Sequence, residues 1–379
     1  MKFMHLADLH LGKTVNGHSM IEDQKFALNN IINLLKEENI KTLVIAGDIY
    51  QNSVPSFDAI NVFDEFITEC KKNNITILII SGNHDSSDRL AFASDILGDS
   101  KIYISKPYNG EIEKISLEDE YGVFNFFLFP YVKPQDVKKY YKDIDANSYS
   151  DAVKAVIDSI EIDEDERNVI ISHQYILNAD RSESEEIYAG EAEAVSSLLY
   201  DKFDYTALGH IHKKQHFLKG KVRYPGALLK YASSESCYDK TITIVDLKEK
   251  NNLEITERRI DYLRDMRIIR GMFEEIVKNS KGDTHKDDYI HIELLDEDDI
   301  FEGLSRLRNI YPNILTFRYI NNRIGENNLE LIKSYENAKN PLELFEEFYY
   351  QRLGIELPEE KRELMKESID RIWGKNENN

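Results

Sequence analysis

The 379-residue sequence is poor in cysteine and has no long apolar run, and these two scarcities exclude several classes of protein. Two cysteines, Cys70 and Cys237, are too few for a disulfide-stabilised scaffold or a cysteine zinc site, which favours a reducing compartment. No apolar run approaches the roughly 20 residues needed to cross a bilayer. The first eight residues already include polar and acidic side chains, unlike a secretory signal. We therefore expect a cytoplasmic protein without a membrane partner.

Basic residues are also in deficit: 48 lysines and arginines stand against 69 aspartates and glutamates, a net charge of -21. Such a charge opposes binding to nucleic acid, because affinity for DNA comes mostly from neutralising its phosphates. Divalent cations or local basic segments would have to supply positive charge wherever a phosphate sits. If DNA is the substrate, we expect the isolated chain to bind it weakly.

Short apolar segments alternate with amphipathic ones over the first 240 or so residues. The apolar segments cover residues 3–7, 43–47, 75–80, 169–172 and 205–209. Continuous apolar runs of this length indicate strands buried on both faces of a sheet. Apolar residues at helical spacing predict helices over residues 23–37 and 56–72. The alternation predicts a layered α/β domain.

Changes of pattern divide the rest of the chain. We expect the α/β domain over residues 1–263, a small α+β domain over 264–325, a linker over 326–340 and a helical segment over 341–379. Within the small domain, the pattern predicts strands over 266–271, 289–295 and 315–320 and helices over 273–279 and 301–311. In the last segment, Gly354 separates two apolar stripes, and Pro358 suits the first turn of a helix.

Each of the five apolar segments stops at side chains that can bind a metal ion. These candidate ligands are Asp8, His10, Asp48, Asn83, His173, His210 and His212. One such residue alone could equally cap a helix, but ligands of α/β sheets bind beyond the carboxyl ends of strands, where all of these lie. Carboxylates, imidazoles and an amide suit manganese, magnesium, iron or zinc. Two divalent ions of this kind can activate a water molecule and stabilise an in-line displacement at phosphorus.

The ordered motifs resemble the signature of the calcineurin-like metallophosphoesterases. They are Asp8-x-His10, Gly47-Asp48, Gly82-Asn83-His84-Asp85, His173 and Gly209-His210-x-His212. Their flanking residues, together with Tyr224-Pro225-Gly226 and residues 307–313, resemble more narrowly the SbcD family of bacterial nucleases, from residue 1 to at least residue 322. The resemblance implies a layered β-sandwich flanked by helices, a small capping domain for DNA recognition and a C-terminal helical tail.

The resemblance also implies a role for each motif. Asp8, His10 and His212 would hold one ion, Asn83, His173 and His210 the other, and Asp48 would bridge the two. The family prefers manganese, with magnesium as the alternative. His84 would act on the scissile phosphate, by protonating the leaving oxygen or stabilising developing charge, and Asp85 would orient its imidazole. Relatives often have a histidine shortly after the bridging aspartate, whereas this chain has Ile49-Tyr50-Gln51, so the role of that segment stays open.

Candidate contacts to the substrate are basic residues near these motifs. Lys213 and Lys214 lie in a stretch from residue 210 to residue 226 that contains no acidic residue and could follow a phosphodiester backbone. A solvated hairpin explains the same stretch equally well. Lys13 and Arg89 flank catalytic motifs and are further candidates.

The resemblance implies a metal-dependent DNA nuclease, the catalytic partner of the SbcC ATPase, acting as a homodimer in DNA repair, recombination and replication. It would cut hairpin and single-stranded DNA, and with SbcC and ATP it would degrade duplex ends in the 3'-5' direction. The helices of residues 341–379 would bind SbcC in a heterotetramer-type complex associated with the nucleoid. Docking of these helices onto the chain's own surface is the alternative. A phosphodiesterase for small molecules or cyclic nucleotides on the same metal site is the alternative enzyme, and a non-catalytic scaffold for the ATPase is the alternative outside enzymes.

Overall fold

The computed structural model describes residues 1–141, 148–185, 194–320 and 357–373, together with residues 342, 345, 346 and 349. The chain forms two compact units. The first comprises Met1–Ile269, Asn279–Ile292 and Leu304–Phe317, and the second comprises Arg270–Lys278, Glu293–Gly303 and Arg318–Asn379. The expected linker over residues 326–340 lies outside the described residues, and the expected domain boundaries stay predictions.

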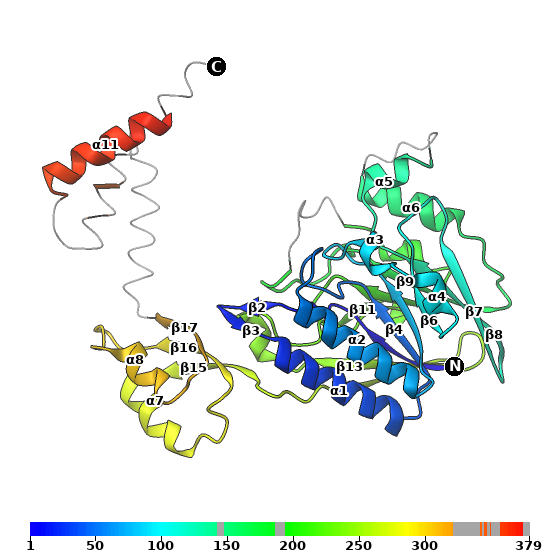
Figure 1. Ribbon diagram of the computed structural model, residues 1–379, viewed down its shortest axis with the longest axis horizontal. Helices are drawn as coiled ribbons and strands as arrows, with labels where there is room; N and C mark the ends of the chain where they lie inside the picture. Colours follow the sequence, from blue (N-terminus) through cyan, green and yellow to red (C-terminus); the bar gives the residue numbers. More distant parts are fainter. Residues whose placement is uncertain are drawn as a thin grey trace. The chain divides into compact units, whose positions relative to one another are not determined.

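Two six-stranded sheets form the centre of the first unit (Figure 1). The first sheet has the order β14 (Leu253–Arg259), β13 (Thr241–Leu247), β1 (Lys2–Leu6), β4 (Thr42–Ala46), β5 (Thr76–Ile80) and β6 (Ile102–Ile104). The second has the order β11 (Gln215–Phe217), β12 (Val222–Tyr224), β10 (Tyr205–Gly209), β9 (Arg167–His173), β8 (Gly122–Phe129) and β7 (Glu113–Asp119). The five predicted strands are β1, β4, β5, β9 and β10, and neighbours among them pair in parallel.

The two sheets pack face to face, and strand periodicity decides which side chains lie between them. On β1, Phe3 belongs to the core between the sheets, whereas Met4 and Leu6 belong to the core under the helices. Phe3 contacts Phe126 of β8 and Tyr205 of β10, with ring centroids 5.5 and 5.8 Å apart. Because both faces of the central strands are covered, their runs are apolar at every position, as predicted.

Helices cover the outer faces of both sheets. α1 (Ile21–Glu37) and α2 (Phe57–Lys72) pack on the first sheet, and α5 (Pro134–Lys138) and α6 (Tyr149–Ser159) lie on the opposite side of the sandwich (Figure 1). The Ser56 side chain accepts a hydrogen bond from the Ala59 N–H and thereby starts α2. The two predicted helices are confirmed, and so is the layered α/β sandwich.

Shorter elements complete the first part of the chain. They are β2 (Thr14–Val15), β3 (His18–Ser19), α3 (Ser87–Leu90), α4 (Ser94–Gly98) and the 3-10 helices η2 (Ser197–Tyr200), η3 (Leu218–Gly220), η4 (Ser233–Cys237) and η5 (Ser280–Gly282). A three-stranded sheet follows, in the order β15 (Met266–Gly271), β16 (Tyr289–Leu294) and β17 (Ile314–Tyr319). Its helices are α7 (Phe273–Asn279) and α8 (Gly303–Arg308). The elements predicted here are confirmed, although the second helix is shorter than predicted.

The last described helix is α11 (Glu359–Trp373). The backbone N–H groups of Lys361 and Arg362 donate to the Pro358 carbonyl, so the helix starts where the proline predicted it. Most of the first helix predicted in this segment lies outside the described residues. Among the described residues, every helix is too short or too polar to cross a membrane.

Candidate metal centre

The candidate ligands lie in sharp turns at the carboxyl ends of the strands. Asp8, His10 and Asp48 have positive φ values of 53°, 46° and 51°, and His210 has a φ of 104°. A left-handed backbone costs about 1–2 kcal/mol per non-glycine residue, and such strain clusters at functional sites. Hydrogen bonds link the turns after β1 and β4: the Asp8 N–H donates to the Gly47 carbonyl (3.1 Å) and the His10 N–H to the Asp48 carbonyl (3.0 Å).

Two of the motif glycines allow these turns to approach one another. A Cβ atom on Gly82 would lie 2.1 Å from Asp48 Oδ1, and one on Gly209 would lie 1.9 Å from the Ala46 carbonyl oxygen. No real Cβ atom tolerates such distances. The glycines next to Asn83 and His210 are therefore required for the strand ends to converge.

The first group of converging side chains is Asp8, His10 and His212, whose ligand atoms lie within 4.8 Å of one another. Nε2 of His10 lies 3.0 Å from Nε2 of His212 and 3.7 Å from Oδ2 of Asp48. All four side chains are buried. Two imidazole nitrogens at this distance, next to buried carboxylates, form a site that suits a cation.

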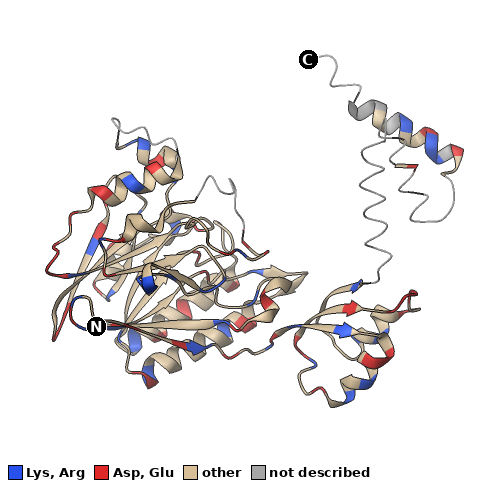
Figure 2. Ribbon diagram, turned by 180° about the vertical axis from the view of Figure 1, so that it is seen from behind, with Lys and Arg blue, Asp and Glu red and all other residues tan. Residues whose placement is uncertain are grey.

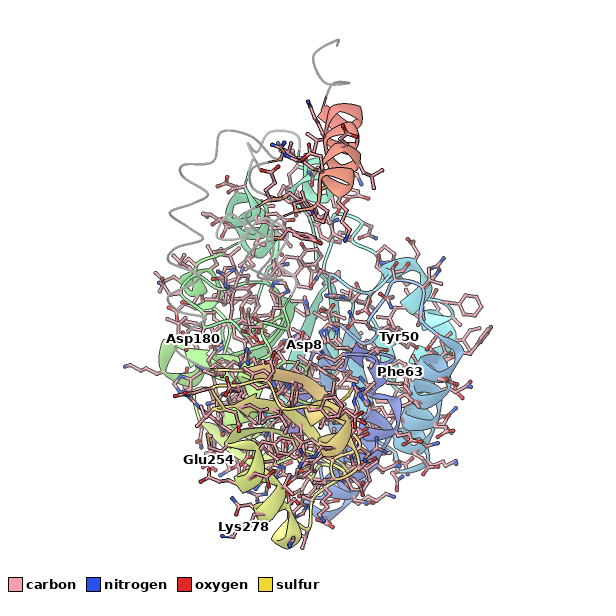
Figure 3. All side chains as sticks on the ribbon, turned by 90° about the vertical axis from the view of Figure 1, so that its left-hand side faces the viewer. Asp8, Tyr50, Phe63, Asp180, Glu254 and Lys278 are labelled. Carbon is pink, nitrogen blue, oxygen red and sulfur yellow. The ribbon has the colours of Figure 1, made fainter. Side chains whose placement is uncertain are left out.

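The second group surrounds Asn83. Its Oδ1 lies 3.0 Å from Nε2 of His173 and 2.9 Å from Nδ1 of His210. Oδ2 of Asp48, which faces His10 in the first group, also lies 3.3 Å from Nε2 of His173. A single carboxylate oxygen therefore contacts both groups. Figure 3 shows Asp8 between Tyr50, which follows β4 of one sheet, and Asp180, which follows β9 of the other.

Burial sets the protonation of these side chains. It lowers the pKa of His10 and His212, and burial together with the charge of His173 lowers the pKa of His210 to about 3, so these three imidazoles are neutral. Burial and the charge of Asp48 raise the pKa of Asp8 to about 8, although the charge of His173 opposes this. For Asp48, burial would raise the pKa, but the charge and the hydrogen bond of His173, together with the other histidines around it, outweigh burial and hold the pKa well below its usual range.

The donor set fits divalent cations of intermediate hardness. Neutral imidazoles, carboxylates and an amide oxygen are ligands of manganese, magnesium, iron and zinc, and bound cations would stabilise the Asp8 and Asp48 carboxylates in their ionised forms. The Nδ1–H of His173 donates to the Ala46 carbonyl (2.8 Å), so Nε2 is the atom that faces Asn83 and Asp48 and that would lose its proton when a cation binds. Metal-binding histidines are oriented in this way.

His84 lies beside the two groups, with its ring centroid 4.8 Å from that of His10. Its backbone N–H donates to Asp48 Oδ1 (2.9 Å), and its Nδ1 lies 2.9 Å from the Gln51 carbonyl oxygen. Because a carbonyl can only accept, Nδ1 carries the proton and Nε2 remains for other partners. The segment whose role the sequence left open thus holds the His84 ring through a backbone carbonyl.

The expectation that Asp85 orients the His84 imidazole is wrong. Its two carboxylate oxygens accept the backbone N–H groups of Ile49 (3.1 Å), Tyr50 (3.0 Å) and Gly82 (2.9 Å). Burial and the charge of Asp48 raise its pKa to about 6. Asp85 therefore fastens the turn after β4 to the turn after β5, because a carboxylate satisfies converging N–H groups more readily than any neutral side chain.

The four predicted substrate contacts differ in their surroundings. Nζ of Lys13 lies 3.2 Å from Oε1 of Gln51 and 5.3 Å from the centroid of the Tyr231 ring, close to the metal-binding turns. The guanidinium of Arg89 donates to the Ser53 carbonyl (2.7 Å). Lys213 and Lys214 are ion-paired, with Asp180 at 2.7 Å and Glu257 at 2.6 Å, respectively. The stretch from residue 210 to residue 226 contains no acidic residue, but acidic side chains from other segments form ion pairs with two of its lysines.

Sequence reasoning missed residues that hold the ligand turns from behind. Gln24 of α1 donates to the His10 carbonyl (2.7 Å) and accepts from the Gly12 N–H (3.0 Å), and the Tyr231 hydroxyl donates to the Leu9 carbonyl (2.6 Å). Around His212 the missed residues are Ser184, Glu185, Glu235 and Lys240. The sequence offered one local signal for these residues, a glutamine among the apolar positions of α1. The other residues lie in loops that carry no recognisable motif.

Comparison with known proteins agrees with this geometry. The family model described as calcineurin-like phosphoesterase matches residues 1–214, and the one described as type 5 capsule protein repressor C-terminal domain matches residues 262–352. The SbcD component of nuclease SbcCD from Staphylococcus epidermidis is 32% identical over 319 residues, which are 83% of this chain and 84% of that protein.

Two solved structures are also similar. A dimetal phosphatase from Danio rerio has 12% identity and a TM-score of 0.39, covering 69% of this chain and 99% of the other. A protein from Thermus thermophilus has 12% identity and a TM-score of 0.39, covering 67% of this chain and 97% of the other.

Proposed function

The chain belongs to the calcineurin-like phosphoesterase family and, within it, to the SbcD nucleases, and we propose that it cuts DNA phosphodiesters as the metal-dependent component of a complex with SbcC. The observation that carries this proposal is the Asp48 carboxylate, one oxygen of which lies 3.7 Å from His10 and 3.3 Å from His173. A carboxylate in that position suits a bridge between two cations.

We assign the ligands as the motif order implies. The first cation would be held by Asp8, His10 and His212 and the second by Asn83, His173 and His210, with Asp48 as a ligand of both. Manganese is the proposed metal, with magnesium as the alternative. When bound, the two cations supply positive charge for phosphate oxygens and lower the pKa of a water molecule.

The chain's own residues supply the rest of the chemistry. The His84 ring is held at Nδ1 by the Gln51 carbonyl, so Nε2 is the atom that could give a proton to the leaving oxygen or stabilise its charge. Asp85 keeps the turn that carries His84 attached to the turn after β4. Lys13 is the best placed of the four proposed phosphate contacts, because its Nζ lies close to the metal-binding turns. Lys213 and Lys214 would have to exchange their carboxylate partners for phosphate.

The substrates proposed are hairpin and single-stranded DNA for the endonuclease, and duplex ends for the ATP-dependent 3'-5' exonuclease that acts with SbcC in DNA repair and recombination. The proposed cellular location is the cytoplasm, in association with the nucleoid. Figure 2 shows Lys and Arg interspersed with Asp and Glu along the ribbon of the first unit, in keeping with weak DNA binding by this chain alone. SbcC would then supply much of the grip on DNA.

The nuclease proposal is tested by nicking of hairpin and single-stranded DNA in manganese. Wild type should cut both, and Asp48→Ala and His84→Ala should each lose more than about 100-fold in rate. His84→Ala should still bind manganese, because His84 is outside the proposed ligand set. His216→Ala, which changes an exposed histidine on β11, is the matched control and should cut normally. Hydrolysis of a cyclic nucleotide with DNA left intact would instead identify a small-molecule phosphodiesterase, and inactivity on both substrates would identify a scaffold.

Binding to SbcC is proposed for residues 341–379. On α11, Leu364 exposes 67% of its surface, and Arg362 forms ion pairs with Glu346 and Glu359. An exposed apolar residue on a charged helix suits a helix-to-partner contact. Leu364→Asp in the full chain should abolish co-purification with SbcC and leave manganese-dependent nicking intact. Unchanged co-purification, for this variant and for a chain lacking residues 341–379, would exclude the tail as the binding segment.

A homodimer is also proposed. Phe57 at the start of α2 and Phe92 after α3 expose 85% and 82% of their surfaces, and Ile96 of α4 exposes 73%. Large apolar side chains at such exposure are typical of association surfaces. Phe57→Glu together with Phe92→Glu should convert a dimer into a monomer in analytical ultracentrifugation, and an unchanged mass would exclude this surface.

A further inference from the structure

His212 is held at both of its backbone groups. Its N–H donates to Oε1 of Glu185 (2.7 Å), and its carbonyl accepts from Nζ of Lys240 (2.8 Å) and from the Ala227 N–H (3.1 Å). A methyl group on Gly226 would lie 2.8 Å from the same carbonyl oxygen, so the turn packs directly against it. The backbone of His212 therefore has little freedom of its own.

The side chain of His212 is held by a chain of hydrogen bonds. Nδ1 lies 2.5 Å from Oγ of Ser184, and the same hydroxyl contacts Oε1 of Glu235, which itself lies 3.7 Å from Nδ1. Because a carboxylate only accepts, the Ser184 hydroxyl donates to Glu235, and the Nδ1–H of His212 donates to Ser184. Nε2 is thereby left as the lone pair facing His10.

Glu235 is itself fixed and completely buried. Nζ of Lys240 lies 2.6 Å from Oε2, the Tyr231 N–H donates to the same oxygen (3.2 Å), and the Ser182 hydroxyl donates to Oε1 (2.8 Å). Lys240 is buried as well. A buried ion pair with its remaining sites hydrogen-bonded is rigid, since separating the two charges would leave each uncompensated.

We propose that Glu235 and Ser184 are positioning residues of the metal centre, which fix the ring orientation and the Nδ1–H tautomer of His212. The inference rests on the proposed role of His212 as a ligand. Nδ1 of His173 and of His84 reaches a main-chain carbonyl, which no side-chain substitution can remove. The ring of His212 depends instead on a carboxylate–hydroxyl relay, so the affinity for one of the two cations can be changed without touching a ligand.

The test is a calorimetric titration of the metal-free full chain with Mn²⁺. Wild type should bind two ions, and Ser184→Ala should weaken one of them by about 10-fold or more while the other keeps its affinity. Ser236→Ala is the matched control, because the Ser236 hydroxyl lies in the same segment as Glu235 but donates to the Ser233 carbonyl; both ions should keep their affinity within about twofold. Ser184→Thr, which retains the hydroxyl, should bind both ions with wild-type affinity.

The melting temperature of each metal-free variant distinguishes positioning from unfolding. Ser184→Ala should melt with wild type. If it does not, the double variant Glu235→Gln with Lys240→Met, which replaces the ion pair by neutral side chains, should still weaken only one ion. Wild-type affinity for both ions in Ser184→Ala or in the double variant would overturn the relay and leave the proposed nuclease intact. Two ions bound at wild-type affinity by His212→Ala would overturn the ligand assignment itself.

Discussion

The two ends of the β-sandwich differ in how their buried charged side chains are paired, and strand β9 (Arg167–His173) reaches both ends. At its first residue, the buried Arg167 guanidinium pairs with Asp119 of β7 (2.5 and 3.1 Å) and donates to the carbonyls of Gly122 and Lys248 (both 2.7 Å). At its last residue, His173 lies among buried carboxylates and imidazoles. One end pairs its carboxylate with a guanidinium of the chain, whereas the other gathers the donor set of a cation site.

The difference shows how one scaffold separates stability from function. The apolar core between the sheets, with Val169 and Ile171 from β9, lies between the two ends and is shared by both. Changes at the Arg167 end should therefore alter the free energy of unfolding, and changes at the His173 end should alter metal binding and catalysis. Residues at functional ends commonly give up stability in this way.

The largest expected effect is on catalysis, at the metal end. Asp8→Asn should lower the rate of manganese-dependent nicking more than about 1,000-fold. The metal-free variant should nevertheless melt within a few degrees of wild type, because asparagine has nearly the same shape and keeps an oxygen that can accept the His210 N–H. Gel assays of nicking and thermal melts of the same preparation measure both quantities. A large drop in melting temperature would show that this end also stabilises the fold.

The second effect is on stability, at the opposite end. Arg167→Met should lower the free energy of unfolding by about 3 kcal/mol, because it removes a buried guanidinium that pairs with Asp119 and donates to the carbonyls of Gly122 and Lys248. Asp119 keeps the N-terminal amino group of Met1 as a charged partner. Nicking per folded molecule should not change. Lys248→Met, which breaks the exposed ion pair with Glu254, is the control and should lower the free energy of unfolding by less than about 1 kcal/mol. Urea unfolding compares the three proteins, and equal stability for Arg167→Met would remove the distinction between the two ends.

Bound Mn²⁺ should stabilise the protein only through the end of the sandwich that contains His173. Mn²⁺ at 100 times its dissociation constant should add about 2.7 kcal/mol to the free energy of unfolding, and a chelator should reverse the gain. Arg167→Met should show the same increment as wild type, since the metal acts elsewhere, and Asp8→Asn should show less. The increment is read from urea unfolding with and without Mn²⁺; its loss in Arg167→Met would mean that the ends are coupled.

The smallest effect depends on pH. Burial alone would raise the pKa of Asp119, but its hydrogen bonds with Arg167, the N-terminal amino group and the Tyr121 N–H together outweigh burial and hold the pKa below its usual range. A depressed pKa stabilises the fold above the unfolded value of about 3.9 and ceases to do so as the pH falls through the folded value. Asp119→Asn should therefore lose about 2 kcal/mol at pH 7, and its difference from wild type should shrink below about pH 4. A difference independent of pH would exclude the ionised pair as its cause.

Much of the fold follows from local sequence pattern. The strands β1, β4, β5, β9 and β10 and the helices α1 and α2 were predicted because their periodicity is set by the residues themselves. The outer strands were not. β13 pairs antiparallel with β1 from more than 200 residues away, and its alternation alone does not say which sheet it joins. Pairing over such a separation is decided by packing of the whole domain.

Part of the candidate site was also predictable from the sequence, and part of it was not. The seven predicted ligands lie together, because parallel strands bring their carboxyl ends to one edge. The ion pairs of Lys213 and Lys214 and the backbone contacts of Asp85 were not predicted, since each depends on where another loop passes. Ser184 and Glu235 were missed for the same reason, because they act through His212 and belong to no motif.

The central claim is that the ends of five strands form one dinuclear metal centre. Anomalous diffraction at the manganese edge, from crystals of the full chain grown with Mn²⁺, tests it most directly. The account predicts two peaks: one against Asp8, His10 and His212, and one against Asn83, His173 and His210, with Asp48 in contact with both. A single peak away from Asp48, or peaks outside these residues, would contradict it.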